Sequence, residues 1–266
     1  MCFKPIKKKD GSIVPCSKCP KCVARRTSAW SYRLMEHEKT SESANFLTLT
    51  YAEEYIPFSN NGLHTITKRD LQLFFKRWRK IANLKTLSYY AVGEYGGKTY
   101  RPHYHILAFN GDIEKVESAW QYGHIYNGTV TGASIGYCLK YMSKPKRKKN
   151  AGGSDDRVPE FAVMSKGIGS SYLDDEANVA WHAEDLLNRM YCVAPGGIKI
   201  SMPRYYKDKL YHDLERANIA EAYAILSHEK QWKKYEESSL KSIRDEQQAI
   251  DAAYDKMYRS SLKTVI

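Results

Sequence analysis

Hydrophobic side chains recur along this chain with two different periods, and these periods predict its strands and helices. In NFLTLTY (residues 45–51), Leu47, Leu49 and Tyr51 alternate with the other positions, as in a half-buried strand. After Thr67 the apolar side chains follow the spacing of one helical face, and Thr67 with Asp70 resembles a capping box at the start of that helix. The residues of this face are Leu71, Phe74, Phe75, Trp78, Ile81 and Ala82.

The segments that follow complete the pattern of a mixed α+β domain. Residues 87–95 and 103–109 are predicted as an antiparallel strand pair, followed by a helix at 111–123, a strand at 124–130 and a helix at 133–144. The order β-α-β-β-α-β suits a ferredoxin-like (split βαβ) antiparallel sheet. We expect the helices to pack on one face of this sheet and leave the other face free for a ligand.

Changes in composition predict four parts of the chain. They are a Cys-rich arm and helix (1–44), a core that carries the sheet (45–149), an additional α+β lobe (150–211) and a charged, helical C-terminal region (212–266). The segment from 144 to 156 is basic and Gly-rich, as expected of a linker or a loop that faces a ligand.

The charge of the chain points to a polyanionic partner. The 266 residues carry a formal charge of +12, and residues 212–266 contribute ten acidic and nine basic side chains, so the surplus lies before them. Lysines and arginines that displace counterions from phosphates give affinity for nucleic acids. The sequence shows neither a signal peptide nor a long apolar run, so we expect no membrane association, a cytoplasmic location and reduced cysteines.

Two histidines and a carboxylate form a candidate metal site. His103 and His105 are two residues apart on a predicted strand and therefore point to the same face. A hairpin between residues 94 and 103 brings Glu94 beside them, and this set of ligands accepts manganese, magnesium or zinc. The alternatives are a coincidental histidine pair and an ion pair between Glu94 and Arg101.

The segment SIGYCLKYMSKPKRKK (134–149) repeats the unit Tyr-x-x-Lys one helical turn apart. Tyrosines four apart occur elsewhere among the 21 in this chain, but only Tyr137/Lys140 and Tyr141/Lys144 double the whole unit. The two tyrosines would share one helix face, which suits a pair of nucleophiles. The alternative is that Tyr137 packs under the sheet and Tyr141 alone reacts.

Four cysteines near the N-terminus form a second candidate metal site. Cys16, Cys19 and Cys22 follow Cys-x-x-Cys-x-x-Cys spacing, and Cys2 offers a fourth thiolate for a structural zinc ion. Iron–sulfur ligation and unliganded thiols are the alternatives. Cys138 and Cys192 are isolated, which is typical of packing residues.

These motifs together resemble the HUH endonucleases, in which two histidines flank a bulky residue and a downstream helix carries one or two nucleophilic tyrosines. The segments FLTLTY, GEYG, RPHYHI, YCLKYMSK, SKGIG and PRYYKDKL are similar to the replication initiators of small single-stranded DNA phages, the microviruses and their gokushovirus branch in particular. They span residues 46–210, so the resemblance covers most of the chain.

The resemblance implies a rolling-circle replication initiator. A divalent metal, Mn²⁺ or Mg²⁺, would be bound by Glu94, His103 and His105. Tyr137 and Tyr141, assisted by Lys140 and Lys144, would nick and rejoin single-stranded DNA through a 5′-phosphotyrosine and leave a 3′-hydroxyl for a polymerase. The partners would be an origin in single-stranded DNA, either extended or folded as a hairpin, and a host polymerase in the host cytoplasm. A host helicase is expected because the sequence contains no P-loop motif.

Basic residues mixed with aromatic ones are the candidates for binding the DNA backbone. They are Arg101, Lys146, Arg147, Lys148, Lys149 and Arg204. The alternative for each basic run is a solvated surface. Two other functions fit part of the pattern: a relaxase or transposase with the same chemistry, and a non-catalytic nucleic-acid-binding module. A binding module leaves the coincidence of Glu94, the paired histidines and the doubled tyrosine unit unexplained.

Overall fold

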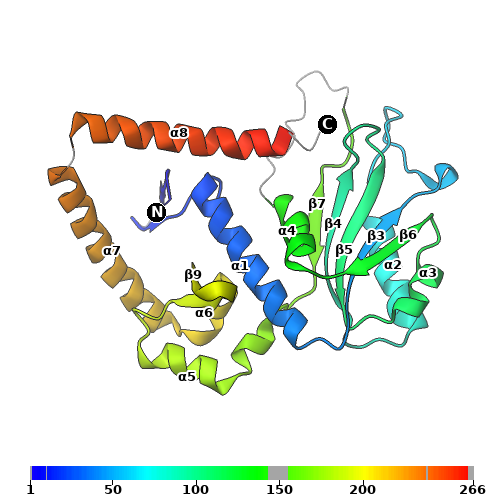
Figure 1. Cartoon of the computed structure of the whole chain (residues 1–266), viewed down its shortest axis with the longest axis horizontal. Helices are drawn as coiled ribbons and strands as arrows, with labels where there is room; N and C mark the ends of the chain where they lie inside the picture. The colour runs from blue at the N-terminus through cyan, green and yellow to red at the C-terminus, as the bar shows by residue number, and fades with distance from the viewer. Residues whose placement is uncertain (1, 10, 143–154, 238, 263–266) are drawn as a thin grey trace. The chain divides into compact units, whose positions relative to one another are not determined.

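The chain forms two compact units in a computed structural model that describes all residues except 1, 10, 143–154, 238 and 263–266 (Figure 1). One unit, here called the sheet unit, comprises residues 33–169 and 259–266. The other, here called the arm unit, comprises residues 1–32 and 170–258. These boundaries differ from the four ranges expected from composition, because contacts group the N-terminal arm with segments far away in the sequence.

The sheet unit contains a five-stranded antiparallel sheet. Its strands are β3 (Ala44–Thr50), β4 (Ser88–Tyr95), β5 (Pro102–Phe109), β6 (Ile125–Thr129) and β7 (Phe161–Met164). Their order is β6-β3-β5-β4-β7, and every neighbouring pair is antiparallel. The predicted α+β class with an antiparallel sheet is confirmed. The edge strand β7 comes from a segment that composition had assigned to the additional lobe.

One face of the sheet packs on α2 (Lys68–Ile81), α3 (Val116–Ala119) and the single turns η1 (Glu53–Tyr55) and η2 (Ile113–Lys115). The alternating side chains of β3 and the apolar face of α2 form one buried cluster, as the two periods predict. Thr67 caps α2 by accepting a hydrogen bond from the Asp70 backbone at 3.1 Å. The other half of the predicted capping box is replaced, because the Thr67 backbone N–H donates to the Tyr104 hydroxyl.

The helix predicted over residues 111–123 is wrong in its extent. Only η2 and the four residues of α3 are helical, and the chain leaves the helix at Trp120. The Trp120 indole donates to the Thr50 carbonyl at 2.9 Å, and the Tyr122 carbonyl accepts from the Ala52 backbone at 2.7 Å. These bonds hold the segment against the end of β3, where a continued helix would not reach.

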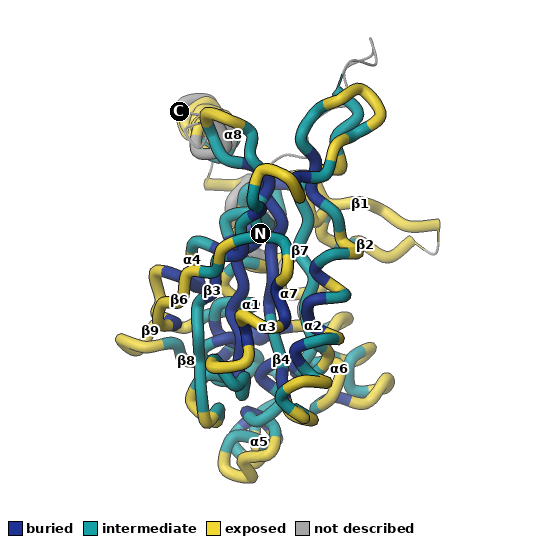
Figure 2. Tube along the Cα trace, turned by 90° about the vertical axis from the view of Figure 1, so that its right-hand side faces the viewer, coloured by how far each residue is buried: buried dark blue, intermediate teal, exposed yellow. Residues whose placement is uncertain are grey.

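The opposite face is also covered, so the expectation that helices occupy one face is wrong. The end of α1 (Pro20–Lys39) places the His37 ring 5.0 Å from the Phe109 ring, and α4 (Gly132–Lys140) buries Ile135, Cys138 and Leu139. The reason is the large apolar area of this face: Tyr90, Val92, Leu107 and Phe109 are fully buried. Buried residues are concentrated in these strands, whereas β1 and β2 are exposed (Figure 2).

The arm unit combines short strands with helices. The strands β1 (Ile6–Lys7) and β2 (Ile13–Val14) pair, as do β8 (Tyr191–Ala194) and β9 (Ile198–Ser201). The helical segments besides α1 are η3 (Ser170–Leu173), α5 (Glu176–Glu184), η4 (Pro195–Gly197), α6 (Arg204–Leu210), α7 (Asp213–Glu236) and α8 (Leu240–Leu262). A small core around Tyr32, Tyr172, Cys192 and Tyr206 joins α1 to this region. None of the described helices is both long and apolar enough to span a bilayer.

Candidate metal centre and nucleophile site

Strand register brings the carboxylate and both imidazoles together. β4 and β5 pair so that Glu94 lies opposite His103, and His105 follows two residues along on the same face. Glu94 Oε1 lies 2.9 Å from His103 Nε2 and 2.7 Å from His105 Nε2. The three side chains therefore converge as the sequence predicted. In contrast, Arg101 donates to Glu53 at 2.6 Å, so the alternative of a Glu94–Arg101 ion pair is wrong.

The far ring nitrogen of each histidine is held by a neighbour. His105 Nδ1 lies 2.9 Å from the Thr48 hydroxyl, and His103 Nδ1 lies 3.1 Å from the Arg101 carbonyl. Such contacts orient the rings and leave both Nε2 atoms facing Glu94. Thr48 escaped the sequence analysis because its place opposite His105 depends on the register of β3 with β5.

The local electrostatics of Glu94 suit a bound cation. Burial, the largest influence, raises the pKa of this carboxyl, but the hydrogen bonds and charges of His103 and His105 outweigh it and lower the pKa to about 2. Its second oxygen, Oε2, is buried and has no hydrogen-bond partner among the described residues. An unsatisfied, ionised carboxylate oxygen beside two imidazoles is the environment that a divalent metal would complete.

The first predicted tyrosine contacts this cluster. Thr131 caps α4 by accepting from the Ser134 backbone, and the helix then directs Tyr137 toward β4. The Tyr137 hydroxyl donates to Glu94 Oε1 at 2.7 Å, and its ring lies 4.8 Å from that of His105. Burial, followed by the negative charge of Glu94, raises the pKa of Tyr137, so this phenol is neutral at physiological pH.

The second tyrosine lies directly beside the first. Tyr141 follows the last residue of α4, and its hydroxyl is 3.5 Å from that of Tyr137. The Lys140 ammonium lies 3.5 Å from the Tyr137 ring centroid and 5.1 Å from that of Tyr141. Three of the four predicted catalytic residues are thus together, and Lys144 lies outside the described residues.

Phe46 is a further contributor that the sequence analysis placed on a strand without a role. Its ring stacks on His105 with centroids 5.5 Å apart and lies 6.4 Å from the Tyr137 ring. It therefore shields one side of the imidazole and fixes the approach of the helix. The strand period that put Phe46 opposite Leu47 was the available signal.

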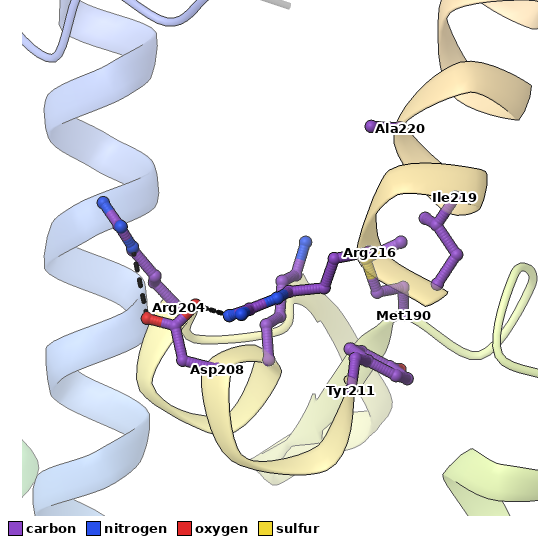
Figure 3. Close-up of a pocket in the computed structure, with 8 residues that line it drawn as sticks. Met190, Arg204, Asp208, Tyr211, Arg216, Ile219 and Ala220 are labelled. Atoms are coloured by element: carbon purple, nitrogen blue, oxygen red, sulfur yellow. Dashed lines mark hydrogen bonds and ion pairs between the residues drawn. The ribbon is translucent and has the colours of Figure 1, made fainter. Parts of the chain in front are cut away.

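The candidate DNA-binding residues are dispersed. Arg101 lies at the start of β5 and donates to the Tyr51 carbonyl as well as to Glu53. Arg204 belongs to the arm unit, where its guanidinium pairs with Asp208 at the edge of a pocket of about 280 Å³ (Figure 3). Lys146, Arg147, Lys148 and Lys149 lie outside the described residues.

Comparison with known proteins places this arrangement in a class. Residues 44–146, which contain four strands of the sheet, α4 and the metal and tyrosine residues, match the family model of the replication-associated protein ORF2. The part of the chain that carries the candidate site is thus similar to replication-associated proteins. No solved structure matches the chain significantly.

Individual relatives narrow the class to phages. The chain is 29% identical over 231 residues to the replication-associated protein VP4 of Bdellovibrio phage phiMH2K, covering 77% of this chain and 70% of that protein. It is 29% identical over 220 residues to the replication-associated protein ORF2 of Spiroplasma virus 4, with 74% and 67% covered. The replication-associated protein ORF4 of Chlamydia phage 1 is 23% identical over 223 residues, with 74% and 53% covered. The predicted resemblance to replication initiators of small single-stranded DNA phages is confirmed.

Proposed function

We propose that this protein initiates rolling-circle replication by nicking and rejoining single-stranded DNA through a 5′-phosphotyrosine. The observation that carries the proposal is the 2.7 Å hydrogen bond from the Tyr137 hydroxyl to Glu94, the carboxylate shared by both histidines. It sets a candidate nucleophile against the only cluster of a carboxylate and imidazoles suited to metal found among the described residues.

Glu94, His103 and His105 would hold the metal, for which Mn²⁺ or Mg²⁺ is our proposal. When bound, it would supply Lewis-acid stabilisation of the charge on a scissile phosphate. The residues themselves favour this use, because three protein ligands leave coordination positions open, whereas a purely structural site would be closed. Thr48 and the Arg101 carbonyl keep the two imidazoles oriented.

The reaction at Tyr137 exchanges one phosphodiester for another. The phenol oxygen forms a bond to phosphorus while the bond between phosphorus and the 3′-oxygen of the preceding nucleotide breaks. The phenol proton leaves to Glu94 or water, and the departing 3′-oxygen takes up a proton to become a hydroxyl. The Lys140 ammonium, beside both tyrosine rings, offsets the negative charge of the phosphate.

Rejoining is the same exchange in reverse, and a second tyrosine makes it useful. With one tyrosine esterified, the other can attack the regenerated origin after a full circle. The 3.5 Å separation of the Tyr137 and Tyr141 hydroxyls supports this alternation, because both can reach one phosphate position. The competing hypothesis, a single reactive tyrosine, now has Tyr137 nearer to Glu94 than its neighbour.

The remaining parts of the proposal rest on the fold and the relatives. A ferredoxin-like assignment is supported by the order β6-β3-β5-β4 of the strands that alternate with α2 and α3. Relatives that are named replication-associated proteins support an origin in single-stranded DNA as the substrate. A host helicase and polymerase, and action in the host cytoplasm, follow from that role. A relaxase or transposase would share the chemistry but cut a different sequence.

Covalent adduct formation tests the proposal. Full-length protein is incubated with origin-bearing single-stranded DNA and Mn²⁺, denatured, and examined for DNA-linked protein by gel and mass spectrometry. We expect an adduct in the wild type, in Y137F and in Y141F, and none in the double variant. Tyr126→Phe is the matched control, because Tyr126 is 65% exposed on β6. An adduct of full yield in the double variant would remove both tyrosines from the site, and none in the wild type would refute the chemistry.

A further inference from the structure

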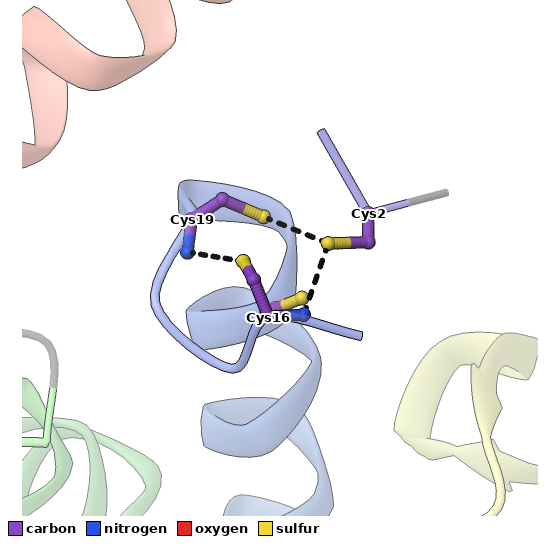
Figure 4. Close-up of side chains that lie close together, drawn as sticks. Cys2, Cys16 and Cys19 are labelled. Carbon is purple, nitrogen blue, oxygen red and sulfur yellow. Dashed lines mark hydrogen bonds between the residues drawn. The ribbon is translucent and has the colours of Figure 1, made fainter. Parts of the chain in front are cut away.

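The four N-terminal cysteines converge in the arm unit. Cys2 precedes β1, Cys16 follows β2, and Cys19 and Cys22 lie at the start of α1 (Figure 4). Their four sulfur atoms all lie within 4.8 Å of one another. Segments separated by a hairpin thus bring every thiol of the predicted cluster to one point.

The spacing of the sulfurs matches a shared central ion better than a disulfide. Cys2 Sγ and Cys19 Sγ are 3.8 Å apart. Two thiolates at corners of a tetrahedron, each about 2.3 Å from a zinc ion, are separated by about 3.8 Å. A disulfide requires about 2.05 Å. All six cysteines are free thiols in the structure, which is consistent with this geometry.

Backbone groups already solvate the sulfurs as they would thiolates. The N–H groups of Cys16 and Cys19 lie 3.2 Å from Cys2 Sγ and 3.3 Å from Cys16 Sγ, and the Phe3 N–H lies 3.5 Å from Cys19 Sγ. Cys19 is fully buried and Cys22 nearly so. These donors orient the sulfurs inward and offset negative charge on them, as outer contacts do in metal sites.

The surrounding arm needs such a cross-link. β1 and β2 contain two residues each, and Ile6 and Ile13 are 52% and 72% exposed. An isolated two-stranded hairpin is marginal in water even when it is longer than this one. The apolar packing of the hairpin therefore cannot hold it in place, and another interaction has to join it to α1.

We propose that Cys2, Cys16, Cys19 and Cys22 bind one structural zinc ion that fastens the N-terminal hairpin to the first turn of α1. Four protein ligands fill the tetrahedral shell, so the ion has no open position for a substrate and takes no part in DNA cleavage. The role of the ion is to order the arm, which carries Lys4, Lys7, Lys8 and Lys9 on its exposed surface.

Metal analysis of three full-length proteins tests this site. After purification and dialysis against a mild chelator, the wild type should retain about one zinc ion per chain, as a tetrathiolate site requires. Cys19→Ser should lose most of it. Cys192→Ala is the matched control, since it removes a buried thiol from the same unit outside the cluster and should retain the zinc.

Two further measurements keep the inference testable if Cys19→Ser fails to fold. A mercurial titrated into the wild type should release zinc as four thiols react, and cobalt in place of zinc should give the visible spectrum of a tetrahedral thiolate site. A His103→Ala/His105→Ala variant should keep its zinc, which separates this inference from the proposed nuclease function. Wild type without zinc, equal zinc in Cys19→Ser, or iron with inorganic sulfide would each overturn it.

Discussion

The two candidate metal sites of this chain contrast in ligands and in support. In the sheet unit, Glu94, His103 and His105 offer three ligands beside a tyrosine hydroxyl. In the arm unit, four cysteines enclose a centre with ligands on every side. An incomplete set of hard and borderline ligands leaves room for a phosphate, while a complete set of soft ligands excludes one. One chain thus separates a reactive site from a structural one by ligand number and type.

The scaffolds differ as much as the ligands. The strands β4 and β5 that carry the first set are buried in a five-stranded sheet and stay folded by their own packing. The second set joins two-residue strands that bury almost nothing. Removing the metal should therefore silence the first site without unfolding it, and unfold the second without affecting chemistry directly.

The largest effect that tests this contrast is expected for His105→Ala. Losing one of three ligands should reduce adduct formation about 10³-fold, because metal stabilisation of the phosphate is worth several kcal/mol. The thermal midpoint and zinc content should change little. His124→Ala, an exposed histidine before β6, serves as control, and an unfolded His105→Ala protein would mean that this ligand set is itself structural.

Cys19→Ser should show the opposite behaviour. Opening the arm removes a cross-link whose entropic value for a loop of this length is about 3 kcal/mol, so proteolysis at the arm lysines should accelerate about 100-fold. Adduct formation by the protein that remains intact should stay near the wild-type rate on a short substrate. Cleavage kinetics followed by mass spectrometry measure the first effect, and loss of nicking by intact protein would contradict the division of roles.

Thr48→Val should produce an intermediate effect in the sheet unit. The substitution removes the hydroxyl next to His105 Nδ1 and keeps the shape of the side chain, so the affinity for Mn²⁺ should fall about 10- to 100-fold. Adduct formation should recover at high Mn²⁺, and Thr48→Ser should restore normal affinity. A metal titration of activity distinguishes this from a packing defect, which additional metal would not correct.

The sequence predicted the ligands of both sites because short-range spacing determines them. His-x-His on a strand fixes one face, and Cys-x-x-Cys-x-x-Cys brings three thiols to one helix start. Thr48 and Phe46 were missed as parts of the site because cross-strand register depends on the whole sheet. Likewise, a strand period could not reveal that α1 and α4 cover the second face, since that follows from tertiary packing of Phe109 and its neighbours.

The smallest effect concerns acid stability of the metal-free protein. The folded pKa of Glu94, about 2, lies below its ordinary value of 4.5, so its ionised form stabilises the fold above pH 4.5 and loses this contribution as the pH falls toward 2. With about 1.4 kcal/mol per pKa unit, a contribution on the order of 1–3 kcal/mol is expected. Glu94→Gln should therefore show a shallower loss of unfolding free energy between pH 4.5 and 2 than the wild type, measured by urea denaturation at each pH. Parallel curves would mean that the histidines do not stabilise the carboxylate, and that the sheet site depends on metal for its assembly as the arm does.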